Sequence, residues 1–342
     1  MSALSPAGST PGGPVAATPA AAGLQEAVDP PVPPSAGGAG GAAPKASRSG
    51  VWAPYLFIAP FVLLFGVFIA YPLLSSLALV TQQTSGPDDR VYVGLDNFRW
   101  LSADPEFWRA CRNTLLFTAG SVFLQIPASL GLAILLNRPD IRGRSVFRLI
   151  FFAPVLVGLA FVAVLFGLIF EKNTGLLNVL LHGLSGYVPF WTHSLEFPWL
   201  QEYGLLAIVL AAFWLSTGYN MIYFLAALQN VSRDLLEAAE IDGAGPWSRF
   251  VHVTLPAIRP IGAFVVLLSV IGSVQLFELP YLLLDPGGGQ EGQGLTVVMY
   301  LYNKGFDVGD LGLSSTVGWV LSVFLLAAAA VQKLVADAGS KR

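Results

Sequence analysis

A short polar segment between two long apolar runs holds the residues of this sequence that are best suited to bind a partner. Three carboxylates, those of Glu237, Glu240 and Asp242, lie within six consecutive residues. The small residues around them are Ala238, Ala239, Gly243 and Ala244. Carboxylates form charge-assisted hydrogen bonds with arginine and lysine, and small side chains allow two backbones to approach closely. The segment is therefore predicted to dock against another protein.

The same segment is predicted to fold as two short helices joined by a turn. Ser232 is the expected N-cap of the first helix, and Gly243 can supply the left-handed residue that ends it. Pro246 suits the first position of the second helix, which Pro256 and Pro260 should end before the next apolar run begins. At spacings of three and four, one face of the first helix would carry Leu235, Ala238, Ala239 and Asp242.

The composition is that of a membrane protein. Hydrophobic residues make up 54% of the chain and charged residues only 11%, against roughly 25% charged in soluble domains. The single cysteine, Cys111, excludes an internal disulfide and a cysteine metal cluster, and the three histidines lack metal-ligand spacing. A net charge of −3 without a basic stripe gives no reason to expect nucleic acid. We therefore expect neither a metal site nor a nucleic-acid partner.

Six membrane spans are predicted, which makes the fold class an all-α membrane protein. The apolar runs lie near Tyr55–Val80, Asn113–Leu136, Val146–Phe170, Gly204–Leu228, Ile261–Leu284 and Gly312–Leu334. The prolines expected to kink the first three spans are Pro60, Pro72, Pro127 and Pro154. Because six is an even number, both termini should lie on the same side of the membrane.

The chain divides into tails and a membrane region. Residues 1–50 are mostly Ala, Gly, Pro and Ser, which cannot bury enough apolar surface to offset the ordering entropy, so we expect disorder there. Residues 51–112 would hold the first span and an outer loop. Residues 113–334 would hold five further spans, with the polar segment inside the connection 229–260, and residues 335–342 a short tail.

Lysine and arginine indicate the orientation, because cytoplasmic loops carry an excess of both. With the N-terminus inside, twelve of the 18 basic residues fall on inner segments and six on outer ones. The outer loop 81–112, with four arginines, argues weakly the other way. The count favours cytoplasmic N- and C-termini, and it places the polar segment between the fourth and fifth spans in the cytoplasm.

Polar side chains inside spans either line a path or join helices through hydrogen bonds, and the sequence leaves both interpretations open. The candidates for a solute pathway are Tyr219, Asn220, Tyr223, Ser273, Gln275 and Glu278. Gln275 and Glu278 are three residues apart and should share one helix face. Aromatic rings beside amide and carboxylate groups suit a polyhydroxylated solute. The glycine-rich run that begins at Gly287 lacks a following Lys-Ser/Thr, so we expect a flexible outer loop rather than a phosphate-binding loop.

The polar segment resembles the EAA loop of membrane permease subunits in binding-protein-dependent ATP-binding cassette (ABC) importers. The matching residues are Glu237-Ala238-Ala239, Asp242-Gly243-Ala244, Phe250, Leu255-Pro256 and Pro260. Other stretches are similar to the carbohydrate-uptake branch, which includes sugar and glycerol-3-phosphate permeases. They are Pro54–Phe57, Tyr71-Pro72, Val93–Phe98, Asn113–Leu115, Gly143-Arg144 and Gly175–Asn178. The resemblance covers about residues 52–334.

This resemblance implies a transport subunit of the bacterial inner membrane rather than an enzyme, importing a sugar or sugar derivative. The coupling residues would be Glu237, Ala238, Ala239, Asp242, Gly243, Ala244, Leu255 and Pro256. The implied partners are two cytoplasmic ATPase subunits, a second and non-identical permease subunit, an extracytoplasmic solute-binding protein and membrane lipid. The chain would bind no cofactor, since ATP and magnesium would belong to the ATPase subunits. The alternative is a secondary, ion-coupled transporter, which would normally show more intramembrane charge.

Overall fold

The computed structural model describes residues 53–86, 89–185 and 197–340, with the side chains of 53, 184–185 and 335–340 excluded. The segment 1–50, which we expected to be disordered, lies outside the described residues. The chain separates into two units after Ala59, and the described part of the first unit is the beginning of helix α1. All other elements described here belong to the second unit.

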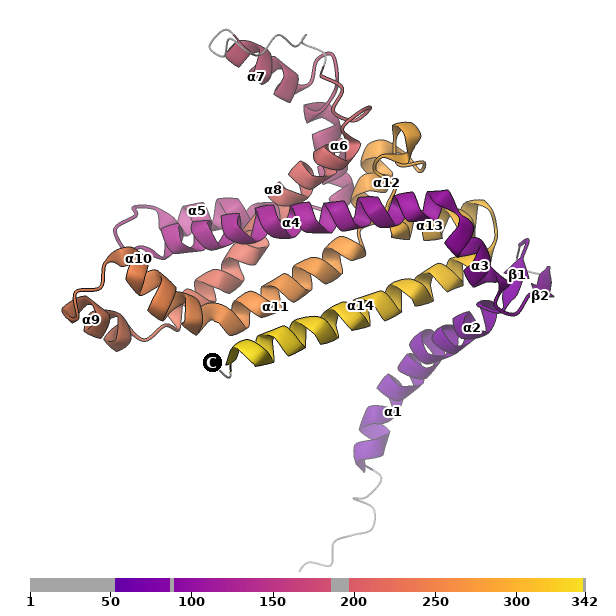
Figure 1. Cartoon of the computed structure of the whole chain (residues 1–342), viewed down its shortest axis with the longest axis horizontal. Coiled ribbons are helices and arrows are strands. Elements are labelled where there is room, and N and C mark those ends of the chain that lie inside the picture. Colours follow the sequence, from indigo (N-terminus) through magenta and orange to yellow (C-terminus); the bar gives the residue numbers. More distant parts are fainter. Residues whose placement is uncertain (1–52, 87–88, 186–196, 341–342) are drawn as a thin grey trace, which may run out of the picture. The chain divides into compact units, whose positions relative to one another are not determined.

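The described residues are almost entirely helical. The helices are α1 (Ala53–Phe65), α2 (Tyr71–Leu79), α3 (Asp96–Ala103), α4 (Pro105–Asn137), α5 (Arg144–Phe152), α6 (Leu159–Ile169), α7 (Leu176–Ser185), α8 (Gly204–Gln229), α9 (Arg233–Ile241), α10 (Pro246–Arg249), α11 (Leu255–Val274), α12 (Glu278–Leu284), α13 (Val297–Tyr302) and α14 (Leu311–Ser340). Short π-helical turns lie at Gly66–Ala70, Phe250–Thr254 and Asn303–Asp307, and 3-10 turns at Ala153–Leu156 and Gln290–Gly292. Figure 1 shows α9 and α10 at one end of the long helices and β1, β2 and α3 at the other. We call these the α9–α10 end and the hairpin end.

Within the described residues, five helices are long and apolar enough to cross a membrane. They are Pro54–Leu79, Pro105–Asn137, Gly204–Gln229, Pro246–Val274 and Leu311–Leu334. The third predicted span is a broken pair, Arg144–Leu156 and Leu159–Ile169, bent by 102°. Pro154 lies just before this bend, where a kink was expected. The helical membrane protein is thus confirmed, with five spans, or six if the bent pair crosses as one.

The all-α expectation missed one small sheet. Strands β1 (Gln82–Thr84) and β2 (Arg90–Tyr92) pair antiparallel, with Gln82 opposite Tyr92. The buried amide of Asn97 donates to the carbonyls of Val80, at 2.8 Å, and Gln82, at 2.9 Å, which fixes the chain as it leaves α2. A strand of three residues is too short for a visible alternation of polar and apolar residues, so hydropathy alone could not reveal it.

Two predicted helix boundaries are corrected by the structure. The helix that contains the second span begins at Pro105, before the apolar run predicted near Asn113, because Asp104 caps the helix by accepting a hydrogen bond from the Glu106 backbone at 2.8 Å. Pro256 and Pro260 do not end the second loop helix, since Pro246–Val274 is helical throughout. The π-helical turn at Phe250–Thr254 directly precedes Pro256, and its wider hydrogen-bond ring relieves the conflict between a proline and the preceding turn.

Helix α4 lies at the centre of the packing. Phe117 belongs to an apolar cluster with α6, α8 and α12, while Ala133 belongs to a second cluster with α8 and α11. Phe107 joins a third cluster with α13 and α14. Gly120 faces Val209, and the hydroxyl of Ser129 donates to the carbonyl of Thr217 at 3.0 Å, so α4 and α8 run parallel. Residues that follow one another along α4 therefore contact residues that follow one another along α8.

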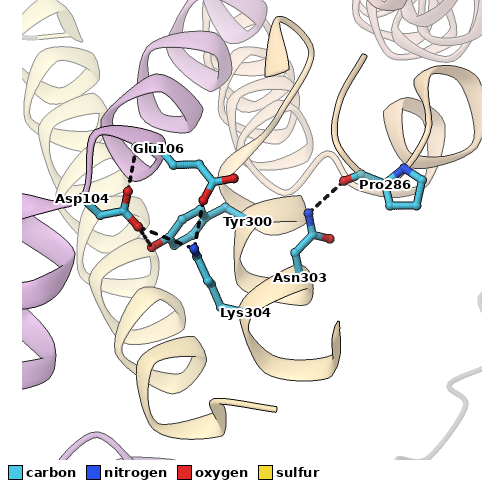
Figure 2. A network of polar contacts seen from close by, with 6 residues as sticks. All are labelled: Asp104, Glu106, Pro286, Tyr300, Asn303 and Lys304. Atoms are coloured by element: carbon cyan, nitrogen blue, oxygen red, sulfur yellow. Dashed lines mark hydrogen bonds and ion pairs between the residues drawn. The ribbon is translucent and has the colours of Figure 1, made fainter. Parts of the chain in front are cut away.

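A partly buried polar network ties the start of α4 to α13 at the hairpin end (Figure 2). The Tyr300 hydroxyl donates to Asp104 Oδ2 at 2.8 Å, and Tyr300 is 1% exposed. Lys304 Nζ lies 2.9 Å from Glu106 Oε2 and 3.7 Å from Asp104 Oδ2. Asn303 in turn donates to the carbonyl of Pro286 at 2.8 Å, which extends the contacts to the glycine-rich loop.

Electrostatics favour the charged forms of this network. Burial opposes ionisation of Asp104, but the hydrogen bonds from Tyr300 and the Glu106 backbone, with the Lys304 charge, outweigh it and lower the Asp104 pKa. Burial also opposes the charge on Lys304, yet the Glu106 and Asp104 carboxylates raise its pKa. The network should therefore stay ionised across the neutral range.

We expect Asp104→Asn to lower the free energy of unfolding at pH 7 by about 1–2 kcal/mol, as for a lost hydrogen bond to a charged group, since asparagine still caps the helix. Because the folded pKa of Asp104 is lowered, its contribution exists above the unfolded pKa of about 3.9 and is lost as pH falls through the folded pKa. Thermal midpoints in detergent should therefore differ at pH 7 and converge below about pH 4. Asp96→Asn, in an exposed pair with Arg99, is the control; an equal loss there would contradict the special role of Asp104.

Candidate functional site

The polar segment forms the predicted pair of helices at the α9–α10 end. Helix α9 ends at Ile241, and Gly243 has a φ of 80°, in the left-handed region that glycine tolerates. The turn is closed by backbone hydrogen bonds from Gly243 to Glu240 at 3.0 Å and from Ala244 to Ala239 at 2.9 Å. Helix α10 starts at Pro246, as expected. Ser232 precedes α9, but its side chain makes no capping hydrogen bond, which corrects that detail.

Apolar side chains on this loop face away from the rest of the chain. Leu235 is 58% exposed, Ile241 86% and Trp247 76%, and no residue of α9 is buried. Apolar side chains gathered at an exposed site indicate a surface for a partner. Ala238 is exposed on the same helix, whereas Ala239 is half-buried.

The three carboxylates of the loop have different surroundings. Glu240 is held by Arg249 of α10, with Oε2 and Nη1 2.5 Å apart, so this acid closes the loop on itself. Glu237 and Asp242 form no ion pair within the described part of the chain, and both are exposed. These two carboxylates therefore remain available to a cationic partner. Leu255 and Pro256 follow at the start of α11, where Leu255 is 42% exposed.

A cavity of about 230 Å³ lies between α4, α6, α8, α11 and α12, and most of its lining surface is apolar. We call it the polar cavity because glutamine, asparagine, serine and tyrosine side chains reach it. Three predicted pathway residues line it, namely Tyr219, Asn220 and Ser273. Tyr223 is not in the lining but shares a hydrogen bond of 2.8 Å with the hydroxyl of Tyr219. The Asn220 amide lies 3.4 Å from the Ser269 hydroxyl across the α8–α11 contact.

Gln125 also lines this cavity and was missed in the sequence. Its side chain is 4% exposed and makes no hydrogen bond to any residue that the structure describes. A lone amide in an otherwise apolar run of α4 was the available signal, because an unpaired buried amide is costly.

Gln275 and Glu278 do not share one helix face, so that prediction is wrong. Helix α11 ends at Val274 and α12 begins at Glu278. In a continuous helix Pro280 would have to donate to the Leu276 carbonyl, but proline has no N–H. The Thr296 hydroxyl donates to that carbonyl instead, at 2.7 Å. Gln275 and Glu278 are both exposed, on either side of this break, and neither lines the cavity.

The glycine-rich loop is held in place rather than free, in contrast to the expectation. Arg109 of α4 donates to the Glu291 carbonyl at 2.6 Å. Asn113, one turn further along α4, donates to the carbonyls of Gly292 at 2.9 Å and Leu295 at 3.1 Å. Among the described residues, no group of three His, Cys, Asp or Glu side chains could hold a metal ion.

Comparisons with known proteins agree on the family. Residues 112–338 match the family of binding-protein-dependent transport system inner membrane components. The chain is 37% identical to the arabinooligosaccharides transport system permease protein AraP of Bacillus subtilis, over 83% of this chain and 91% of that protein. It is 36% identical to the lactose transport system permease protein LacF of Rhizobium radiobacter, over 78% and 88%.

The fold also matches a solved importer. A chain of a bacterial alginate ABC transporter, crystallised with an alginate pentasaccharide-bound periplasmic protein, superposes with a TM-score of 0.71 at 24% identity, over 86% of this chain and 96% of that one. The family match, the two relatives and the apolar helices together place the chain in the bacterial inner membrane. It belongs to the binding-protein-dependent transport system inner membrane components and is a permease subunit of a carbohydrate ABC importer.

Proposed function

We propose that this permease subunit moves a sugar or sugar-derived solute into the cytoplasm, driven by ATP hydrolysis on two separate ATPase subunits. ATP and Mg²⁺ would bind to those subunits and not to this chain. A second, non-identical permease subunit would complete the membrane channel, and a solute-binding protein would deliver the solute from outside. Arabinooligosaccharides and lactose, which the names of two relatives specify, are the first solutes to test.

The termini and the α9–α10 end would face the cytoplasm, and the hairpin end would face outward. The excess of lysine and arginine on the inner segments supports this orientation. It places the exposed surface of the α9–α10 loop where a cytoplasmic ATPase can reach it (Figure 1). It also places the glycine-rich loop, with β1 and β2, on the side of the binding protein.

The observation that carries the proposal is the helical continuity between the loop and the fifth span. Pro246–Val274 forms 29 consecutive helical residues, and Leu255 and Pro256 lie inside it. The docking residues would be Glu237, Ala238, Ala239, Asp242, Gly243 and Ala244. When ATP closes the ATPase subunits, a displacement of these residues would pass directly to α11 and to the cavity it lines.

The solute pathway would run through the cavity lined by Tyr219, Asn220 and Ser273, with Tyr223 supporting Tyr219. Gln275 and Glu278 would line the same pathway at the break after α11. A carboxylate exposed within a span is costly against lipid, so the exposure of Glu278 favours a water-filled path or a partner subunit. Rings, amides and hydroxyls together can pair with the hydroxyl groups and apolar faces of a sugar.

A cysteine at position 239 should crosslink to the ATPase. We would introduce Ala239→Cys into a Cys111→Ala chain, co-express it with the ATPase subunits and apply a short bifunctional reagent. The crosslink should be specific and should change with ATP. Ser145→Cys is the control, because Ser145 is exposed near the start of α5 and outside the loop. If position 239 gives no crosslink in a folded complex, the docking proposal fails.

The turn at Gly243 should be required for coupling. Gly243→Val would force a β-branched residue into a φ of 80°, which costs roughly 1–2 kcal/mol or more and displaces α9 from α10. Transport and binding-protein-stimulated ATP hydrolysis should fall together by at least about tenfold, since 1.4 kcal/mol corresponds to that factor. Gly245→Val is the matched control, because Gly245 is extended with open space around it. Equal activities in the two variants would exclude a role for the turn.

Asn220→Ala should change which sugar is transported. Loss of the amide should lower uptake of the preferred sugar about tenfold and alter the ratio of lactose to arabinotriose uptake, as for a lost solute hydrogen bond. Ser269→Ala removes the partner of Asn220 on α11 and serves as the comparison. If both variants lower the thermal midpoint equally and leave the sugar ratio unchanged, Asn220 joins helices and does not contact solute.

A further inference from the structure

A second pocket, of about 480 Å³, lies at the start of α4. It is lined by Arg109, Arg112, Asn113 and Leu116 of α4, by Glu202, Tyr203, Leu205 and Leu206 at the start of α8, and by Glu291 and Gln293 of the glycine-rich loop. We call it the outer pocket. Its volume falls within the roughly 300–1,000 Å³ of small-molecule sites. We propose that the outer pocket is a carbohydrate subsite through which the solute passes before it enters the polar cavity, an inference that rests on the proposed function.

The first support is the position of the outer pocket along α4. This helix has 33 residues and is about 50 Å long at 1.5 Å per residue, whereas the hydrocarbon core is about 30 Å thick. The apolar run begins only after Asn113, so Arg109 and Arg112 belong to turns that extend beyond the hydrocarbon. The outer pocket would then lie beyond the lipid chains, where an aqueous solute can reach it.

The second support is the alignment of the outer pocket with the polar cavity. On α4 the outer pocket ends at Leu116 and the cavity lining begins at Phe117. On α8 the outer pocket ends at Leu206 and the cavity lining begins at Ala212. Since α4 and α8 run parallel, the two spaces follow one another along the same pair of helices.

Apolar side chains separate the two spaces. Phe117 is 2% exposed, Ile208 is fully buried, and Leu284 of α12 is 6% exposed within the same cluster. A Cβ added at Gly294 would lie within 3.1 Å of the Ile208 side chain and even closer to Leu284, so the glycine-rich loop packs directly onto this barrier. A solute bound in the outer pocket would therefore be separated from the polar cavity by a closed apolar layer.

The third support is the chemistry of the lining. Arg112 is a free donor, while Glu202 and Glu291 present carboxylate acceptors and Gln293 an amide, and none of these side-chain groups is hydrogen-bonded within the described residues. The Tyr203 ring stacks on Phe197 with centroids 4.7 Å apart and is 43% exposed, so its other face can stack on a sugar. Two carboxylates beside two guanidinium groups leave no net charge to select an anion. A neutral sugar needs donors, acceptors and a flat apolar face together, and this lining offers all three.

The test uses the complete importer, with both permease subunits, the ATPase subunits and the binding protein, in proteoliposomes with radiolabelled lactose and arabinotriose. We expect the double variant Arg112→Gln, Glu202→Gln to lower the sugar transported per ATP hydrolysed about tenfold. The matched control is Arg99→Gln, Asp96→Asn, which removes an exposed ion pair at the same end of the chain and outside the pocket.

A shift only in the half-saturating concentration of binding protein would overturn the subsite and make the surface a protein docking site. Equal sugar-to-ATP ratios in the double variant and wild type would also overturn the subsite while leaving the proposed function intact. If the wild-type importer accumulates neither sugar, the proposed function fails, and the subsite fails with it.

Occupancy can be measured directly by thiol labelling. In a Cys111→Ala chain, Gln293→Cys places a thiol in the outer pocket, and the transported sugar should slow its reaction with a maleimide several-fold. Ser102→Cys, at an exposed position of α3, is the control whose labelling the sugar should not change. If the sugar does not change the rate of maleimide labelling at position 293, the subsite proposal is overturned.

Discussion

A hydrogen bond of 2.7 Å from the Thr296 hydroxyl to the Leu276 carbonyl stabilises the break between α11 and α12, on which the arrangement of the interior depends. A bilayer offers no water to a backbone carbonyl, so a broken helix is tolerated only where protein or a water-filled cavity satisfies the freed group. Pro280 has no N–H to donate to the Leu276 carbonyl, and the Thr296 hydroxyl satisfies that carbonyl instead. The result is a span that ends at Val274 and exposes Gln275 beside a polar cavity, instead of a continuous apolar rod.

Helix α4 contacts most of the features that define the fold and the candidate site. Its first turns hold the glycine-rich loop through Arg109 and Asn113, its middle contributes Gln125 to the cavity, and Ala133 packs against α8 and α11 near the other end. Asp104 fixes where this helix begins and binds Tyr300 of α13. The glycine-rich loop, the cavity and the contact with α8 and α11 are therefore all positioned by one helix.

Local signals in the sequence predicted local structure well. The turn at Gly243 and the start of α10 at Pro246 depend on the conformations of single residues, and both agree with the structure. Two of the failures were non-local. No residue near Leu276 indicates that Thr296, 20 residues later, satisfies the Leu276 carbonyl. The fifth span was therefore predicted to continue through the break. The glycine-rich loop looked flexible because the side chains that hold it, Arg109 and Asn113, lie about 180 residues earlier.

The candidate site divides in the same way. Glu237 and Gly243 could be identified from a contiguous motif, whereas the cavity lining comes from five helices and only part of it was recognised. Gln125 was overlooked because its meaning depends on which face of α4 meets α8 and α11. Proline was misjudged at Pro256 because a π-helical turn, which has no clear sequence signature, absorbs its strain.

The unbroken helix from Pro246 to Val274 sets the amplitude of any movement it transmits. At 1.5 Å per residue, its 29 residues span about 43 Å. A tilt of only about 5° around one end would displace the other by about 4 Å, comparable to the width of a methylene chain. Small rotations at the α9–α10 end would thus become atomic-scale displacements at the break before Glu278, without any span having to unfold.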